Sequence, residues 1–148
     1  MIQAAAIGRH ANVLEVGAGS GYAAALLGRL ARQVTAIERY RDLALDAAAR
    51  LARLGIANVS VIEGDGTLGF PEQSPFDAIL VAAAGPEPPP PLLEQLASGG
   101  RLVMPVDAGL GGQRLVVIRR GESGEFERRE LCAVRFVPLV GAHGIEPC

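Results

Sequence analysis

The stretch that decides the fold is Val13-Leu14-Glu15-Val16-Gly17-Ala18-Gly19-Ser20-Gly21-Tyr22. Four residues typical of a buried strand lead directly into glycines at every second position, and an alanine- and leucine-rich helix is predicted over residues 22–32. Glycine allows the backbone to approach a ligand closely, and the free N–H groups of the first helical turn point toward that ligand. The stretch therefore predicts a binding site for a nucleotide-like ligand at the carboxyl end of the first strand of an open α/β sheet.

The spacing of the glycines leaves two classes of cofactor open. Counted from Gly17, the dinucleotide pattern G-x-G-x-x-G fails at Tyr22, whereas the looser form G-x-G-x-x-A fits when counted from Gly19. Glu15 favours a cofactor with a positively charged group over a dinucleotide, because a buried carboxylate needs a positive or hydrogen-bonding partner. The ammonium group of a methionine moiety is such a partner, and a pyrophosphate is not. The pattern E-V-G-x-G-x-G resembles motif I of class I S-adenosylmethionine-dependent methyltransferases.

Length and composition indicate one globular domain over residues 1–148. Hydrophobic residues make up 49% of the chain and charged residues 20%, which is typical of a folded domain. The net charge is −2 and no basic cluster stands out, so the charge pattern gives no support for nucleic-acid binding. The two cysteines do not make a disulfide scaffold, and no metal site is predicted. Because no apolar run reaches the roughly 20 residues of a membrane-spanning helix, we expect a cytoplasmic monomer without membrane contact.

Acidic residues follow the second and third predicted strands at the same edge of the sheet. Glu38 ends the second strand, where a carboxylate can accept hydrogen bonds from both hydroxyl groups of a ribose. The alternative for Glu38 is that it serves as an N-terminal acid of the next helix. Asp65 lies between two glycines after the third strand. Its side chain either accepts a hydrogen bond from an adenine amino group or only forms a turn.

The remaining segments alternate between strands and helices and then change character. Strands are predicted at residues 13–16, 34–37, 59–63, 76–81 and 102–106, and helices at residues 1–7, 22–32, 41–54 and 92–96. Residues 115–119 and 131–137 are strand-like and are joined without room for a helix, so one closing strand runs antiparallel to the others. We therefore predict an α/β, Rossmann-like fold with a mostly parallel twisted sheet, helices on both faces and a C-terminal antiparallel hairpin.

Four further segments carry a pattern that extends beyond the glycine-rich stretch. They are Gly64-Asp65-Gly66, Phe76-Asp77-Ala78-Ile79, the G-G-x-L-x-x-P-V segment at residues 99–106 and the V-x-F-V-P-L segment at residues 134–139. In this order and spacing the chain resembles the protein-L-isoaspartate O-methyltransferase family, and the last two segments are the most specific. The resemblance covers nearly everything from Ile7 to Val140. It implies methyl transfer from S-adenosylmethionine to the carboxylate of L-isoaspartyl residues in damaged proteins.

The resemblance also implies roles for particular residues. On the cofactor side, Glu15 is expected near the ammonium group, Glu38 at the ribose and Asp65 at the adenine. The backbone that shapes this pocket is expected at Gly17, Ala18, Gly19, Ser20, Gly21 and Gly66. The acceptor side is expected at Ala83, Phe136, Val137, Pro138 and Leu139, although residues 136–139 fit an apolar strand end in the core equally well. Because a carboxylate nucleophile is ionised at neutral pH, no general base is needed and no catalytic residue is assigned.

Two departures from the family pattern keep other functions open. The family carries a T-x-S-x-P motif ahead of the helix that leads into the first strand, and no residue of this chain matches its serine. Family members usually have threonine-alanine-alanine after the fourth strand, where this chain has Ala82-Ala83-Ala84. The alternatives are a cofactor-binding remnant without turnover, a methyltransferase for another peptide or small-molecule carboxylate, and a nicotinamide enzyme.

Overall fold

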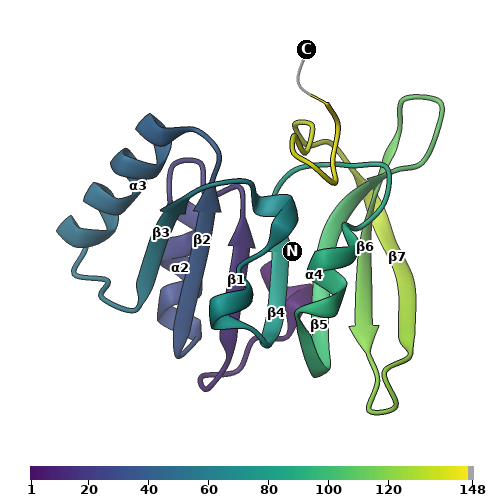
Figure 1. Cartoon of the computed structure of the whole chain (residues 1–148), viewed down its shortest axis with the longest axis horizontal. Helices are drawn as coiled ribbons and strands as arrows, with labels where there is room; N and C mark the ends of the chain where they lie inside the picture. The colour runs from purple at the N-terminus through teal and green to yellow at the C-terminus, as the bar shows by residue number, and fades with distance from the viewer. Residues whose placement is uncertain (147–148) are drawn as a thin grey trace.

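A computed structural model describes residues 1–146 and contains one seven-stranded sheet (Figure 1). In sheet order the strands are β3 (Val59–Glu63), β2 (Gln33–Glu38), β1 (Asn12–Val16), β4 (Phe76–Val81), β5 (Leu96–Asp107), β6 (Gln113–Arg120) and β7 (Phe126–Val134). The chain builds the sheet outward from β1, first toward β3 and then toward β7. The carboxyl ends of β1 and β4 therefore lie at the point where the strand order reverses, which is where open α/β sheets bind ligands.

The direction of the strands changes only in the carboxyl-terminal part of the sheet. β1 pairs in parallel with both β2 and β4, β2 pairs in parallel with β3, and β4 pairs in parallel with β5. β6 pairs antiparallel with both β5 and β7, so β6 is the reversed strand. These pairings confirm the predicted α/β fold with a mostly parallel sheet and a C-terminal antiparallel hairpin.

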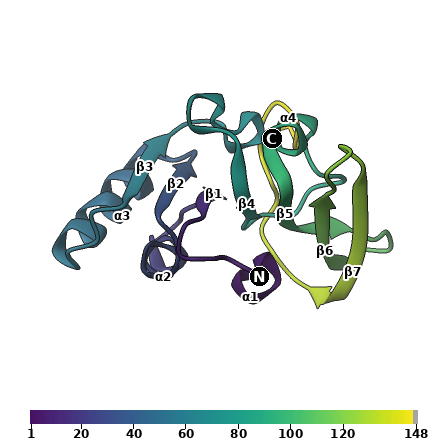
Figure 2. The same ribbon diagram turned by 90° about the horizontal axis from the view of Figure 1, so that it is seen from below.

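Helices lie on both faces of the sheet (Figure 2). One face carries α1 (Ile2–Ala5), α2 (Tyr22–Leu30) and α3 (Arg41–Arg53), whose buried side chains include Leu27 and Leu51. The other face carries α4 (Pro90–Glu94), where Leu92 packs with Leu14 and Phe76, and the short 3₁₀ turns η1 (Gly66–Leu68) and η2 (Pro71–Gln73) precede β4. None of the helices within residues 1–146 is long and apolar enough to cross a membrane.

The burial of the strands explains why their sequences differ. Residues 13–16 of β1 and residues 78–81 of β4 are buried, because both faces of these central parallel strands are covered. Such strands are mainly apolar rather than alternating, and Glu15 is the one charged residue in these two stretches. β7 is an edge strand that carries charged residues at positions 127–130, a composition that discourages pairing with another chain.

The boundaries in the carboxyl-terminal part differ from the predicted ones. β7 covers residues 126–134 rather than 131–137, because an exposed, charged edge strand has no apolar periodicity to mark its start. β5 begins at Leu96, and the predicted helix at 92–96 lies earlier, at Pro90–Glu94. The pairing register between β4 and β5 shifts between Phe76 and Ala78, which pair with Leu96 and Arg101. The extra residues of β5 at this irregularity include the glycines at residues 99–100.

Candidate functional site

The loop at residues 17–21 joins β1 to α2 in a conformation that depends on glycine. The φ angles of Gly17, Gly19 and Gly21 are 89°, 52° and 83°, all in the left-handed region that disfavours side chains. The N–H of Gly17 donates to the carbonyl of Ile37 at 2.8 Å, which ties the loop to β2. A Cβ on Gly21 would also lie only 3.2 Å from the Cβ of Ala47 in α3. The loop is therefore fixed by the backbone and by close packing.

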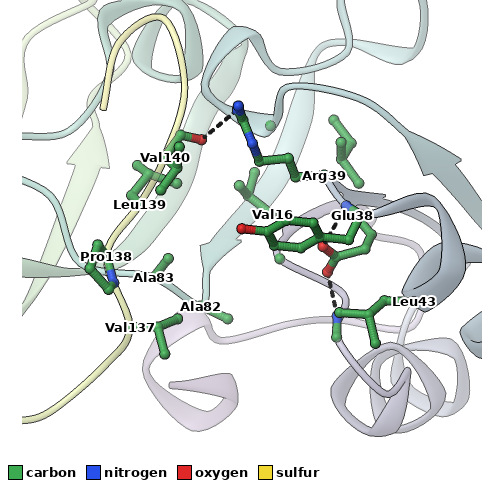
Figure 3. A pocket seen from close by; sticks show the side chains of 15 residues that line it. Val16, Glu38, Arg39, Leu43, Ala82, Ala83, Val137, Pro138, Leu139 and Val140 are labelled. Atoms are coloured by element: carbon green, nitrogen blue, oxygen red, sulfur yellow. Dashed lines mark hydrogen bonds between the residues drawn. The ribbon is translucent and has the colours of Figure 1, made fainter. Parts of the chain in front are cut away.

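Glu38, the last residue of β2, connects this loop to the start of α3. Its Oε2 accepts a hydrogen bond from the N–H of Gly19 at 2.8 Å, and its Oε1 accepts one from the N–H of Tyr40 at 3.0 Å (Figure 3). The residue is 6% exposed and lines the adjoining cavity. Because an ionised carboxylate has about four acceptor positions, Glu38 keeps acceptor capacity for ligand hydroxyl groups after making these two bonds.

A cavity of about 280 Å³ lies beside the glycine loop. Glu38 and Leu43 line it on one side, and Ala83 and residues 137–140 line it on the other (Figure 3). Ile37 also belongs to the lining. The walls are mainly apolar and Glu38 supplies a carboxylate, an arrangement suited to an apolar ring system that carries a few hydroxyl groups. The cavity thus brings the end of β2 and a segment from the far end of the chain to one site.

Glu15 lies outside the lining of this cavity and is buried in β1. It is 2% exposed, and its Oε2 has no hydrogen-bond partner within residues 1–146. Burial raises the pKa of Glu15 to about 8, and the negative charge of Glu38 acts in the same direction. Glu15 is therefore mostly protonated at pH 7. Its contact with an ammonium group stays a prediction.

Asp65 uses its carboxylate to bind its own chain and borders a second cavity together with Arg39. Its Oδ1 accepts from the N–H and the hydroxyl of Thr67, at 2.9 and 2.7 Å, and its Oδ2 accepts from the N–H of Ala142 at 2.8 Å. Burial acts to raise the pKa of Asp65, but the hydrogen bonds from Ala142 and Thr67 and the charge of Arg39 bring it below the usual value. This geometry is that of the turn-forming alternative, and the contact with adenine stays a prediction.

The other predicted residues fall into two groups. Those that line the first cavity are Gly17, Gly19, Gly66, Ala83, Val137, Pro138 and Leu139. Those outside its lining are Ala18, Ser20, Gly21 and Phe136. The N–H of Phe136 donates to the side chain of Gln113 at 2.7 Å, so this residue is fixed against β6 instead.

Seven residues of the lining are not among the predicted site residues, namely Arg39, Tyr40, Leu43, Val140, Val16, Ile37 and Ala82. The first two follow Glu38 directly, so their place after the acid at the end of β2 was an available signal. Leu43 lies in the first turn of α3 and is 42% exposed, so it resembles any surface residue of an amphipathic helix. Val140 reaches the site only through the folding of the carboxyl-terminal segment.

The strand order, the glycine loop after β1 and the acid at the end of β2 define the class by its fold, the Rossmann-like fold of class I methyltransferases. A solved protein-L-isoaspartate O-methyltransferase matches with a TM-score of 0.88 at 30% identity, over 97% of this chain and 46% of that one. A Plasmodium falciparum structure described as the same enzyme, in complex with S-adenosyl-L-homocysteine, matches with a TM-score of 0.73 at 27% identity, over 90% and 67% of the two chains.

The sequence comparisons identify the family. A family model described as protein-L-isoaspartate(D-aspartate) O-methyltransferase matches residues 1–144. Protein-L-isoaspartate O-methyltransferase 2 of Pelobacter propionicus is 52% identical over 144 residues, which are 97% of this chain and 64% of that protein. The chain belongs to the protein-L-isoaspartate O-methyltransferase family, and it spans less than two thirds of the length of this relative.

The buried carboxyl group of Glu15 should make stability depend on pH. Its pKa rises from 4.5 to about 8 on folding, so the folded protein keeps a proton that the unfolded chain releases. Wild-type stability should therefore fall as the pH rises from about 4.5 to 8, and Glu15→Gln should remove this loss. We expect the variant to gain roughly 3–5 kcal/mol relative to wild type between pH 4.5 and pH 8.5, measured by urea unfolding. Identical pH slopes for the two proteins would show that Glu15 is ionised in the folded state.

The bridge made by Glu38 should be visible in amide exchange. The N–H groups of Gly19 and Tyr40 bond different carboxylate oxygens, and Glu38→Gln replaces one of these oxygens by an NH2 group that cannot accept. Losing a bond to a charged acceptor costs about 1.5–3 kcal/mol, which corresponds to roughly 10- to 100-fold faster exchange at one of these amides. Glu63→Gln, at the end of the neighbouring strand β3, is the matched control. Unchanged exchange at both amides in Glu38→Gln would contradict the bridge.

Proposed function

We propose that this chain binds S-adenosylmethionine in the cavity beside the glycine loop and methylates the carboxylate of L-isoaspartyl residues in proteins. The observation that carries the proposal is the carboxylate of Glu38, which is held by the glycine loop and faces a mainly apolar cavity in a member of this family. The related Plasmodium falciparum structure, solved with S-adenosyl-L-homocysteine, supports the choice of cofactor. Residues 1–148 then form one cofactor-binding domain.

The residues of the cavity fit the parts of this cofactor. Glu38 has acceptor positions left for the two ribose hydroxyls, and Ile37 and Leu43 supply apolar surface for the adenine. Gly17 and Gly19 line the cavity without side chains, so backbone can approach the methionine portion closely. The ribose and the adenine thus each have a matching surface in the same cavity.

The reaction requires little from the chain beyond the correct placement of the methyl donor and the acceptor carboxylate. When bound, S-adenosylmethionine supplies an electrophilic methyl group, and the isoaspartyl carboxylate is already ionised at neutral pH. Ala83 and residues 137–140 form the apolar wall that would exclude water and align the acceptor. Alignment of two reactants contributes up to about 7–11 kcal/mol to lowering a barrier, so a site without a general base can still accelerate this displacement.

One observation favours a second candidate function, cofactor binding without turnover. Residues 82–84 are all alanine, and residues 137–140 carry no side-chain hydrogen-bond donor. This wall therefore offers an acceptor carboxylate few partners among the described residues. Methyl transfer to the carboxylate of a different peptide or of a small molecule stays a prediction. The cytoplasmic location, the monomeric state and the lack of nucleic-acid and membrane partners also stay predictions.

Cofactor choice is tested by titration calorimetry with S-adenosyl-L-homocysteine and with NAD. We expect binding of S-adenosyl-L-homocysteine and no comparable binding of NAD, because the loop lacks the G-x-G-x-x-G spacing counted from Gly17. Glu38→Ala should weaken S-adenosyl-L-homocysteine by about 1.5–3 kcal/mol through loss of charged hydrogen bonds. Tighter binding of NAD would rule out the proposal, and unchanged affinity in Glu38→Ala would remove the ribose role.

The acceptor is tested by radiolabelled methyl transfer to paired isoaspartyl and aspartyl peptides of the same sequence at saturating cofactor. The proposal predicts methylation of the isoaspartyl peptide only. Cofactor binding without transfer to either peptide would favour the second candidate function. Equal transfer to both peptides would point to a methyltransferase for another carboxylate.

A further inference from the structure

The cavity wall at residues 137–140 is held to the end of β4 by backbone hydrogen bonds. The N–H of Ala84 donates to the carbonyl of Val137 at 2.8 Å, and the N–H of Leu139 donates to the carbonyl of Ala84 at 2.7 Å. Beyond Val140 the chain turns back on itself, because the N–H of Ile145 donates to the carbonyl of Leu139 at 2.7 Å. The wall therefore continues directly into a closed turn at residues 141–145.

This turn rests on the side chains of Asp65 and Thr67. The N–H of Ala142 donates to Asp65 Oδ2 at 2.8 Å, and the N–H of His143 donates to the Thr67 hydroxyl oxygen at 3.2 Å. The Thr67 hydroxyl in turn donates to Asp65 Oδ1 at 2.7 Å, and Thr67 is fully buried. A Cβ on Gly141 would collide with the Asp65 carboxylate, so the two backbones approach as closely as glycine permits.

Arg39 adds a third attachment from the end of β2. Its Nη1 donates to the carbonyl of Val140 at 3.4 Å (Figure 3). Arg39 borders both cavities, whereas Asp65 borders only the second and Thr67 neither. The side chains of Asp65 and Thr67 thus act on the first cavity through the turn that they hold.

We propose that Asp65 and Thr67 are positioning residues that hold the turn at residues 141–145 and thereby fix the acceptor wall at residues 137–140. This inference rests on the proposed function, because it assigns the wall to the acceptor of the methyl group. The proposal gives the segment Gly64-Asp65-Gly66, through Asp65, a role in aligning the acceptor. An adenine contact by the same carboxylate is an alternative that the experiment separates.

Thr67→Val tests the proposal, because valine keeps the shape of threonine and removes the hydroxyl. We expect at least tenfold faster amide exchange at residues 142–145 and a rise of at least tenfold in the KM of an isoaspartyl peptide. Affinity for S-adenosyl-L-homocysteine should change less than threefold, because Thr67 borders neither cavity. Thr67→Ser should restore exchange and KM toward wild type. Ser74→Ala, which removes a hydroxyl that donates to Pro71 in η2, is the matched control.

The amide exchange requires no turnover, so it tests the anchoring even in a chain that methylates nothing. Unchanged exchange at residues 142–145 in Thr67→Val would overturn the proposal. A loss of cofactor affinity as large as the rise in KM would also overturn it, because the effect would then not be confined to the acceptor wall. Asp65→Asn should match Thr67→Val in exchange and KM. If Asp65→Asn instead weakens an adenosine ligand far more than its inosine analogue, Asp65 binds adenine and the proposal fails for that residue.

Discussion

The carboxylate of Glu38 is the group on which the rest of the site depends. It joins two loops that follow neighbouring strands, because one oxygen accepts from the N–H of Gly19 and the other from that of Tyr40. The hydrogen bonds from these two backbone amides compensate Glu38 for the hydration that its burial removes. Its negative charge also helps to keep the nearby carboxyl group of Glu15 protonated. Glu38 faces the cavity, whereas Glu15 lies outside its lining.

The two sides of the cavity that we propose for the cofactor and for the acceptor are built in different ways. The cofactor side comes from consecutive segments, the glycine loop after β1 and the residues at the end of β2, with conformations set by local sequence. The acceptor side comes from residues 137–140, which reach the site through contacts with Ala84 and, beyond them, with Asp65 and Thr67. Substitutions in the first part act on the ligand contact directly. Substitutions at Asp65 and Thr67, which hold the second part, would act on it from outside this cavity.

This difference explains what the sequence could predict. The parallel sheet, the glycine loop and the position of Glu38 follow from strand and glycine patterns within short windows, and the structure has them where they were expected. The use of the Asp65 carboxylate depends on Ala142, 77 residues away, and no local pattern contains that information. The start of β7 was missed because an exposed edge strand with charged residues has no buried face. Glu15 was correctly expected to be buried, but its place outside the cavity depends on how the loop folds over β1.

We propose that Glu38 binds the ribose of the cofactor while it holds the glycine loop. A crystal structure of this chain with S-adenosyl-L-homocysteine tests it most directly. We expect both ribose hydroxyls within about 2.6–3.0 Å of the Glu38 carboxylate oxygens, with the bond from the N–H of Gly19 retained. A ligand bound elsewhere, or a ribose that makes no contact with Glu38, would contradict it.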